Sequence, residues 1–139
     1  MKLRRPEGTG GERGAAAVEF ALLLPVLLLL IFGIIDFGRA LNAQVTLTQA
    51  AREGARLAAL GQLNVVSRTQ AAATGLSPVT VTIVTSCPPD AGPGVNATVT
   101  VSYSYSFITP VGSFMAMFGV AKPGSSTTLS AQGVEPCET

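Results

Sequence analysis

The feature that most constrains the fold is an apolar run of 21 residues, from Ala15 to Ile35, that follows a charged, glycine-rich start. As an α-helix this run is about 32 Å long, which matches the roughly 30 Å hydrocarbon core of a bilayer. The one ionisable residue inside it is Glu19. A charge at the centre of a membrane helix costs about 2.5 to 3.5 kcal/mol, so such a residue is a candidate functional group. The sequence therefore predicts a transmembrane helix over residues 15–36 that carries a functional acid.

Cleavage of the chain between Gly14 and Ala15 would provide this acid with a partner. The new α-amino group of Ala15 would lie four residues before Glu19. Positions i and i+4 are neighbours on a helix surface. The amine could then neutralise the carboxylate of its own chain or of an adjacent subunit.

The surrounding residues resemble the TadE-like family of pseudopilins, which belong to the tight-adherence (Flp) pilus assembly system. The resemblance covers residues 14–61 and is carried by Gly14 and by the segments 17–25, 32–39 and 50–56.

This resemblance implies a set of partners and roles. A prepilin peptidase would cleave after Gly14, and Glu19 with Phe20 would form the processing and assembly motif. Other pilin or pseudopilin subunits and the pilus assembly platform would be the binding partners.

The charge distribution predicts a single-pass protein of the cytoplasmic membrane with its amino terminus inside. Residues 1–14 carry four basic and two acidic side chains, whereas residues 15–139 carry five basic and six acidic ones. Basic residues beside a spanning helix orient that side toward the cytoplasm. We therefore expect residues 1–14 to be a flexible cytoplasmic leader. A cleaved secretory signal is the alternative, but residues 36–39 do not form a small-residue cleavage site.

The helix is expected to continue outside the membrane over residues 37–61, which are rich in Ala, Leu, Gln, Arg and Glu and contain no Pro. Small residues four apart, at Ala50, Gly54 and Ala58, allow another element to approach closely. That element is either a sheet of the same chain or another subunit. Asp36 and Arg39 form an i to i+3 surface pair that we expect to mark the outer membrane boundary.

Residues 62–139 are predicted to form a small extracytoplasmic α+β domain. A helical stretch over 64–73 precedes two segments of alternating polarity, in which Val79, Val81 and Ile83 and then residues 95–107 present apolar side chains to one face. These segments predict an antiparallel hairpin, and residues 127–132 predict a third strand with Leu129 and Ala131 inward. The fold class is therefore α+β and pilin-like: one long N-terminal helix packed on a small antiparallel sheet of about three strands.

An apolar segment between the second and third strands has two interpretations. Its large side chains fall at helical spacing: Val111, Phe114, Met115 and Phe118. The segment is either a turn that packs on the core or an apolar contact surface for the membrane or a partner subunit.

The cysteines predict a structural disulfide. Cys87 and Cys137 both lie in the extracytoplasmic part, where disulfides persist. Closing a loop of about 50 residues is worth roughly 4 kcal/mol in the chain-entropy model.

The remaining composition argues against catalysis. The chain has no histidine, which removes the commonest general base and most metal sites. Asp90 and Glu135 lie in a turn and near the terminus. We expect no catalytic residue, metal, cofactor or small-molecule substrate, and the absence of a basic patch with interleaved aromatic residues argues against nucleic-acid binding.

The sequence thus favours a non-enzymatic pseudopilin or minor pilin, with a disulfide, for assembly of a tight-adherence type IV pilus, which either enters the cell-surface fibre or only primes its assembly. The alternative is a monomeric membrane-anchored extracytoplasmic binding module, whose placement would not depend on pilus machinery. A membrane-tethered enzyme that uses Asp90 or Glu135 is a third class.

Overall fold

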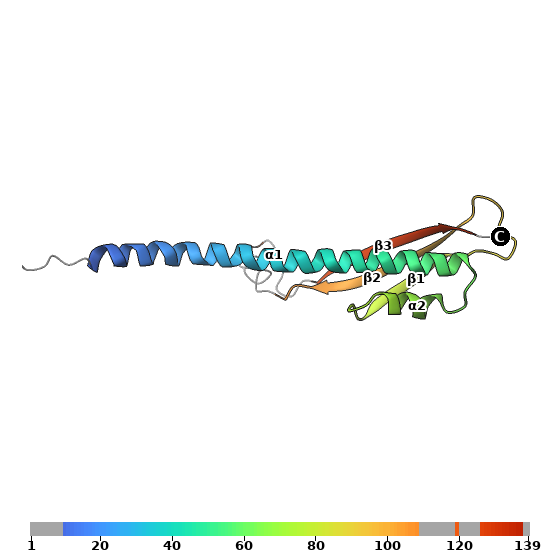
Figure 1. Ribbon diagram of the computed structural model, residues 1–139, viewed down its shortest axis with the longest axis horizontal. Helices are drawn as coiled ribbons and strands as arrows, with labels where there is room; N and C mark the ends of the chain where they lie inside the picture. Colours follow the sequence, from blue (N-terminus) through green and yellow to red (C-terminus); the bar gives the residue numbers. More distant parts are fainter. Residues whose placement is uncertain (1–9, 109–118, 120–125, 138–139) are drawn as a thin grey trace, which may run out of the picture.

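The computed structural model describes residues 10–108, 119 and 126–137. Its elements are, in chain order, α1 (Gly10–Ala59), α2 (Val65–Ala72), β1 (Val79–Thr85), β2 (Asn96–Ser106) and β3 (Ser126–Pro136). Figure 1 shows α1 running along the molecule, with α2 and the strands gathered beside its C-terminal half. The predicted α+β class, with one long helix on a three-stranded antiparallel sheet, is confirmed.

The long helix α1 is continuous over 50 residues and contains Pro25. From Gly14 to Ala59 it is long and apolar enough to cross a membrane, and its most apolar window is 0% buried. It begins at Gly10, so the last residues of the predicted flexible leader are helical, because extending an existing helix adds one hydrogen bond per residue.

The end of α1 is capped by its own backbone. Gly61 adopts a φ of 64°, which glycine tolerates without steric strain. The Gly61 N–H donates to the Ala58 carbonyl at 3.2 Å, and the Gln62 N–H donates to the Leu57 carbonyl at 3.0 Å. This is the Schellman arrangement, and it turns the chain back toward α2.

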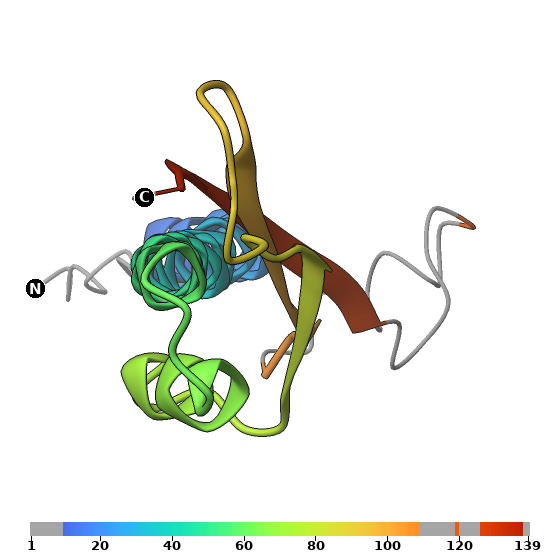
Figure 2. The same cartoon turned by 90° about the vertical axis from the view of Figure 1, so that its right-hand side faces the viewer.

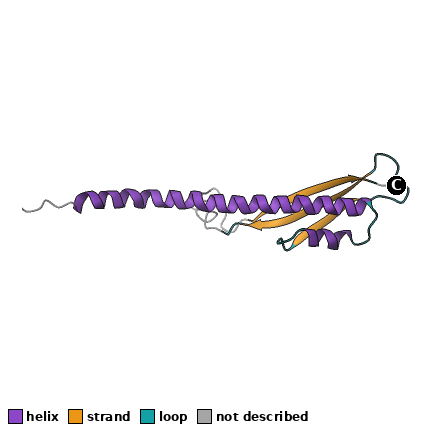
Figure 3. Cartoon of the chain, in the orientation of Figure 1, coloured by secondary structure: helices purple, strands orange, loops and turns teal. Residues whose placement is uncertain are grey.

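The sheet has the order β1-β2-β3, with both pairs antiparallel. Central pairs include Val81 with Val101 and Val101 with Ala131. The two helices lie on the same face of the sheet, α1 against β2 and β3, and α2 against β1 (Figures 2 and 3). The opposite face carries short hydroxyl side chains such as Thr100, Ser102 and Ser130.

The core forms where the small-residue stretch of α1 meets this sheet. Its fully buried members include Leu47, Ala50, Ala55, Val99 and Val101. A Cβ at Gly54 would lie 3.0 Å from Val99 Cγ1, and one at Gly133 would overlap the carbonyl group of Ala51. The open question about the small residues is therefore answered for this chain, because its own sheet and α2 cover them.

The edge strand β1 departs from the predicted pattern at its end. Val79 is buried and Val81 packs against the core, but Ile83 is 40% exposed. The register with β2 shifts between Ile83 and Thr85. Ile83 itself stays in register opposite Val99, so the irregularity begins only after it, at the end of the strand.

The disulfide between Cys87 and Cys137 is present, with a Cα–Cα distance of 5.7 Å. It follows β1 and β3, the two edge strands, and closes across the beginning of β2. The Cys137 N–H donates to the Val95 carbonyl at 2.9 Å, which holds the C-terminal end of β3 in place. Figure 1 shows that β3 ends at the end of the molecule away from the amino terminus, and Cys137 is the residue that follows β3.

We predict that Gly133→Ala lowers the free energy of unfolding by about 1 to 3 kcal/mol, because overpacking of a close contact costs this much. The measurement is urea unfolding of the full chain in detergent, followed by circular dichroism. Gly92→Ala is the matched control, since a Cβ there meets nothing within 4 Å. Equal midpoints for the two variants would contradict the close approach of β3 to α1.

Candidate functional site

The predicted processing residues lie on the part of α1 that extends beyond the sheet. Gly14, Ala15, Glu19 and Phe20 are all exposed, and Phe20 is 60% exposed. Ala15 and Glu19 lie on one continuous helix, so their four-residue spacing places them on the same face. The carboxylate is therefore presented at the start of an apolar cylinder and is accessible to another molecule.

At the other end of the apolar segment, α1 is joined to the sheet through Asp36. This residue is only 3% exposed. The Tyr105 hydroxyl donates to the Asp36 carbonyl at 2.9 Å, and the Ile108 N–H donates to Asp36 Oδ1 at 3.3 Å. These partners are 69 and 72 residues away in the sequence. We call Asp36, Arg39, Tyr105 and Ile108 the boundary junction.

Arg39 completes the boundary junction from one turn further along α1. Its Nη1 lies 3.5 Å from the Tyr105 hydroxyl and 3.7 Å from Asp36 Oδ1. The guanidinium carbon is 5.6 Å from the centre of the Tyr105 ring, a cation–π distance. Tyr105 in turn meets Phe107 edge to face at 5.5 Å.

The expectation of a surface ion pair at Asp36 and Arg39 is wrong for the acid. The Asp36 side chain is 4% exposed and the Arg39 side chain 44%. Asp36 is buried beside the end of β2, where the Tyr105 hydroxyl and the Ile108 N–H donate hydrogen bonds to it. A buried carboxylate needs such partners, so the pair is part of a tertiary contact.

The environment of Tyr105 changes its acidity. Burial raises the pKa of the hydroxyl above its ordinary value of 10.0, an effect that Arg39 opposes and Asp36 reinforces. The neutral phenol is therefore the form that the boundary junction favours.

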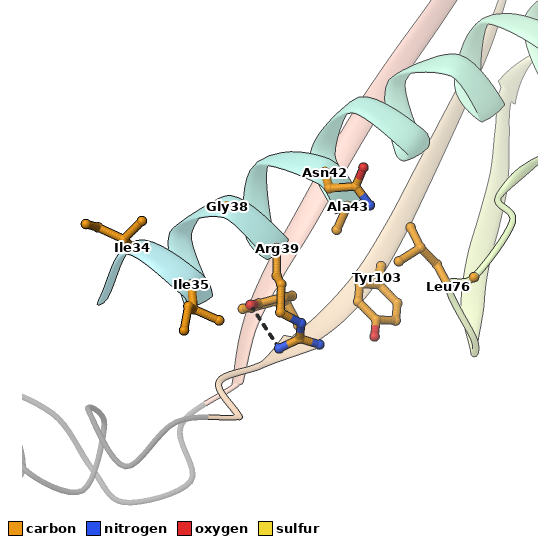
Figure 4. A pocket seen from close by; sticks show the side chains of 10 residues that line it. Ile34, Ile35, Gly38, Arg39, Asn42, Ala43, Leu76 and Tyr103 are labelled. Atoms are coloured by element: carbon orange, nitrogen blue, oxygen red, sulfur yellow. Dashed lines mark hydrogen bonds between the residues drawn. The ribbon is translucent and has the colours of Figure 1, made fainter. Parts of the chain in front are cut away.

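A groove opens beside the junction, between α1, the segment before β1, and β2 (Figure 4). Its volume is about 500 Å³. The residues that define its two sides are Ile34, Ile35, Arg39, Asn42, Leu76 and Tyr103. We call this the boundary groove.

The predicted site residues that the structure describes do not gather in one place. The processing residues, the boundary junction and the disulfide lie at the beginning, the middle and the far end of the molecule (Figure 1). Val111, Phe114, Met115 and Phe118 lie outside the described residues. A distributed set of this kind supports anchoring and packing better than a single reaction centre.

Sequence reasoning missed the roles of Tyr105 and Ile108. In the alternating pattern of residues 95–107, Tyr103 and Tyr105 are simply two of the positions on the apolar face. They are the only tyrosines in the chain. Because tyrosine is enriched where one end of a side chain is apolar and the other is hydrated, the pair was a usable signal for a membrane interface.

The fold and these sites define an α+β protein whose N-terminal helix is suited to membrane anchoring and whose small domain packs on the far half of that helix. Residues 14–56 match the sequence model of the family described as TadE-like protein, which confirms the resemblance over this segment. No curated protein and no solved structure matches the chain. The family match begins at Gly14 and ends within α1.

We predict that Tyr105 titrates above 10.0 in the folded protein. In Tyr103→Phe, tyrosinate absorbance reports Tyr105 alone, since the chain has only two tyrosines. The same variant unfolded in urea provides the ordinary value. Because the folded state holds the proton more tightly, the free energy of unfolding decreases as pH rises from the unfolded pKa through the folded one. Identical titration curves for the folded and unfolded samples would contradict the buried junction.

Proposed function

We propose that the chain is a non-enzymatic pseudopilin or minor pilin subunit of a tight-adherence type IV pilus. A prepilin peptidase cleaves it between Gly14 and Ala15, and α1 holds it in the cytoplasmic membrane with the amino terminus inside. The observation that carries this proposal is the family match to residues 14–56, which begins at Gly14 and covers both the apolar and the sheet-bound parts of α1.

The position of Glu19 supports a role in assembly. The carboxylate is exposed on α1 within the segment suited to a membrane, where an unpaired charge is unfavourable. Cleavage creates an α-amino group four residues away on the same helical face. In the assembled state the Ala15 amine of one subunit pairs with Glu19 of its neighbour, so the two helices are in register only when the charges meet. A buried polar pair of this kind specifies register.

The exposed face of α1 supports packing of helices side by side. Beyond the predicted membrane segment, Leu41 and Val45 are 51% and 56% exposed, four residues apart on the side turned away from the sheet. Phe37, at 65% exposed, precedes them at the same spacing. These residues continue the apolar surface of the membrane segment outward. A neighbouring α1 would bury that surface along its length. A continuous apolar surface of this kind indicates an interaction site, whereas apolar residues exposed singly do not.

We assign no catalytic residue. Asp90 is exposed in the loop before β2, and Glu135 is half-buried in β3, at the end of the molecule that carries the disulfide. The extracytoplasmic domain is instead a small packed unit whose sheet rests on the anchor helix. Its function in this proposal is structural.

We predict that Glu19→Ala is still cleaved but enters the pilus fraction about tenfold less than the wild type, or lower. Removing one member of a buried ion pair costs about 3 to 5 kcal/mol because the other charge remains unpaired, and 1.4 kcal/mol already corresponds to a factor of ten. Cell-surface pili are sheared, and the subunit is quantified in the fibre and membrane fractions.

Glu53→Ala is the matched control for this experiment. Glu53 lies on α1 outside the apolar segment and forms a surface pair with Arg56, at 3.8 Å. We expect this variant to be incorporated normally. Normal incorporation of Glu19→Ala would refute the assembly role, and correct placement of the wild type in cells without the pilus machinery would favour the binding-module alternative.

A further inference from the structure

The lining of the boundary groove changes from apolar to polar along α1, as the membrane changes from hydrocarbon to headgroups. Ile34 and Ile35 line the part nearest the apolar segment of α1, and Arg39 and Asn42 line the next turn (Figure 4). Tyr103 and Leu76 contribute from the opposite side. The volume of about 500 Å³ lies within the range of about 300 to 1,000 Å³ that small ligands occupy in proteins.

The position of this groove relative to the membrane follows from where the apolar run of α1 ends. The apolar run ends at Ile35, and Arg39 follows four residues later, which is about 6 Å along the helix. The headgroup layer extends roughly 5 to 7 Å beyond each side of the hydrocarbon core. If α1 spans the membrane as the proposed function requires, Arg39 lies at the level of the lipid phosphates, and Ile34 and Ile35 lie beside the first acyl methylene groups.

Arg39 keeps donors for a ligand at this level. Its contacts to Tyr105 and Asp36, at 3.5 Å and 3.7 Å, are long, and both use Nη1. A guanidinium group carries five N–H donors in a planar fork that matches phosphate oxygens. The side chain is 44% exposed, so the remaining donors are accessible from the groove.

From these observations we propose that the boundary groove binds one glycerophospholipid of the outer leaflet. Arg39 binds the phosphate, Asn42 provides an adjacent amide donor, and Ile34 and Ile35 contact the start of an acyl chain. This inference rests on the membrane anchoring in the proposed function, and it adds a specific lipid ligand. A bound lipid would fill the angle between α1 and the sheet and stabilise the domain in one orientation above the membrane.

The test is lipid retention by the purified full chain in detergent, measured by native mass spectrometry. The protein is offered phosphatidylglycerol or digalactosyl diacylglycerol with identical acyl chains, so that the two lipids differ only in the headgroup, which contains an anionic phosphate in the first and uncharged sugar in the second. We expect the phospholipid to be retained about tenfold more, the factor that corresponds to charged hydrogen bonds of ordinary strength. A third sample contains inorganic phosphate as a competitor, which separates a lipid site from a free phosphate site.

Two variants address the groove and one serves as the control. Arg39→Gln removes the phosphate donors, and Gly38→Leu fills the groove without altering Arg39, since a Cβ at Gly38 meets nothing within 4 Å. Both are expected to lose the preference for the phospholipid. Arg56→Gln removes an exposed arginine of the same helix far from the groove and is expected to retain it. Circular dichroism verifies that each variant is folded.

Several outcomes would overturn the proposal: no preference in the wild type, unchanged retention in Arg39→Gln, equal loss in Arg56→Gln, or displacement of the lipid by inorganic phosphate. Retention is measured without a pilus, so it does not depend on Glu19 pairing. A Glu19→Ala variant that assembles normally would contradict the assembly role and leave the lipid result intact. Impaired assembly of Glu19→Ala, together with no lipid preference in the wild type, would contradict the lipid site alone.

Discussion

The structure depends on one helix that meets two environments. Residues 15–35 of α1 are apolar apart from Glu19, whereas the side of the second half that the sheet covers consists mainly of alanine and glycine, together with Leu47 and Leu57. Large residues at Ala50, Ala51 or Ala55 would hold β2 and β3 away, because these positions are fully buried. The domain can therefore pack on α1 only where the side chains are small. This division determines where the domain sits and leaves the first half of α1 for the membrane.

The boundary junction lies where these two halves meet. Asp36 accepts a hydrogen bond from Ile108, and its carbonyl accepts another from Tyr105, so the end of β2 is tied to the last turn before the sheet-covered part of α1. At the opposite end, the disulfide joins the two edge strands. The sheet is consequently held at both ends, by polar contacts near the predicted membrane surface and by a covalent bond far from it.

The elements with strong local signals could be predicted from the sequence, and contacts between distant residues could not. Hydropathy predicted α1, and alternation predicted β1 and β2. The strand β3 extends to Pro136, beyond the predicted 127–132. A glycine within a strand ordinarily weakens it, but Gly133 allows the backbone of β3 to lie against Ala51 of α1. This contact between distant residues cannot be predicted from the local pattern. Asp36 was expected at the surface because the donors that bury it are about 70 residues away, which no local pattern reveals.

In the proposed function, α1 remains both anchor and scaffold after the chain is cut near the beginning of this helix. The most direct measurement is the intact mass of the protein extracted from cell membranes, which reports where the chain starts. We expect a chain that begins at Ala15 and retains residues 15–35 together with the disulfide-bonded domain. A mass that corresponds to a start at Met1, or to a start after Ile35, would contradict it.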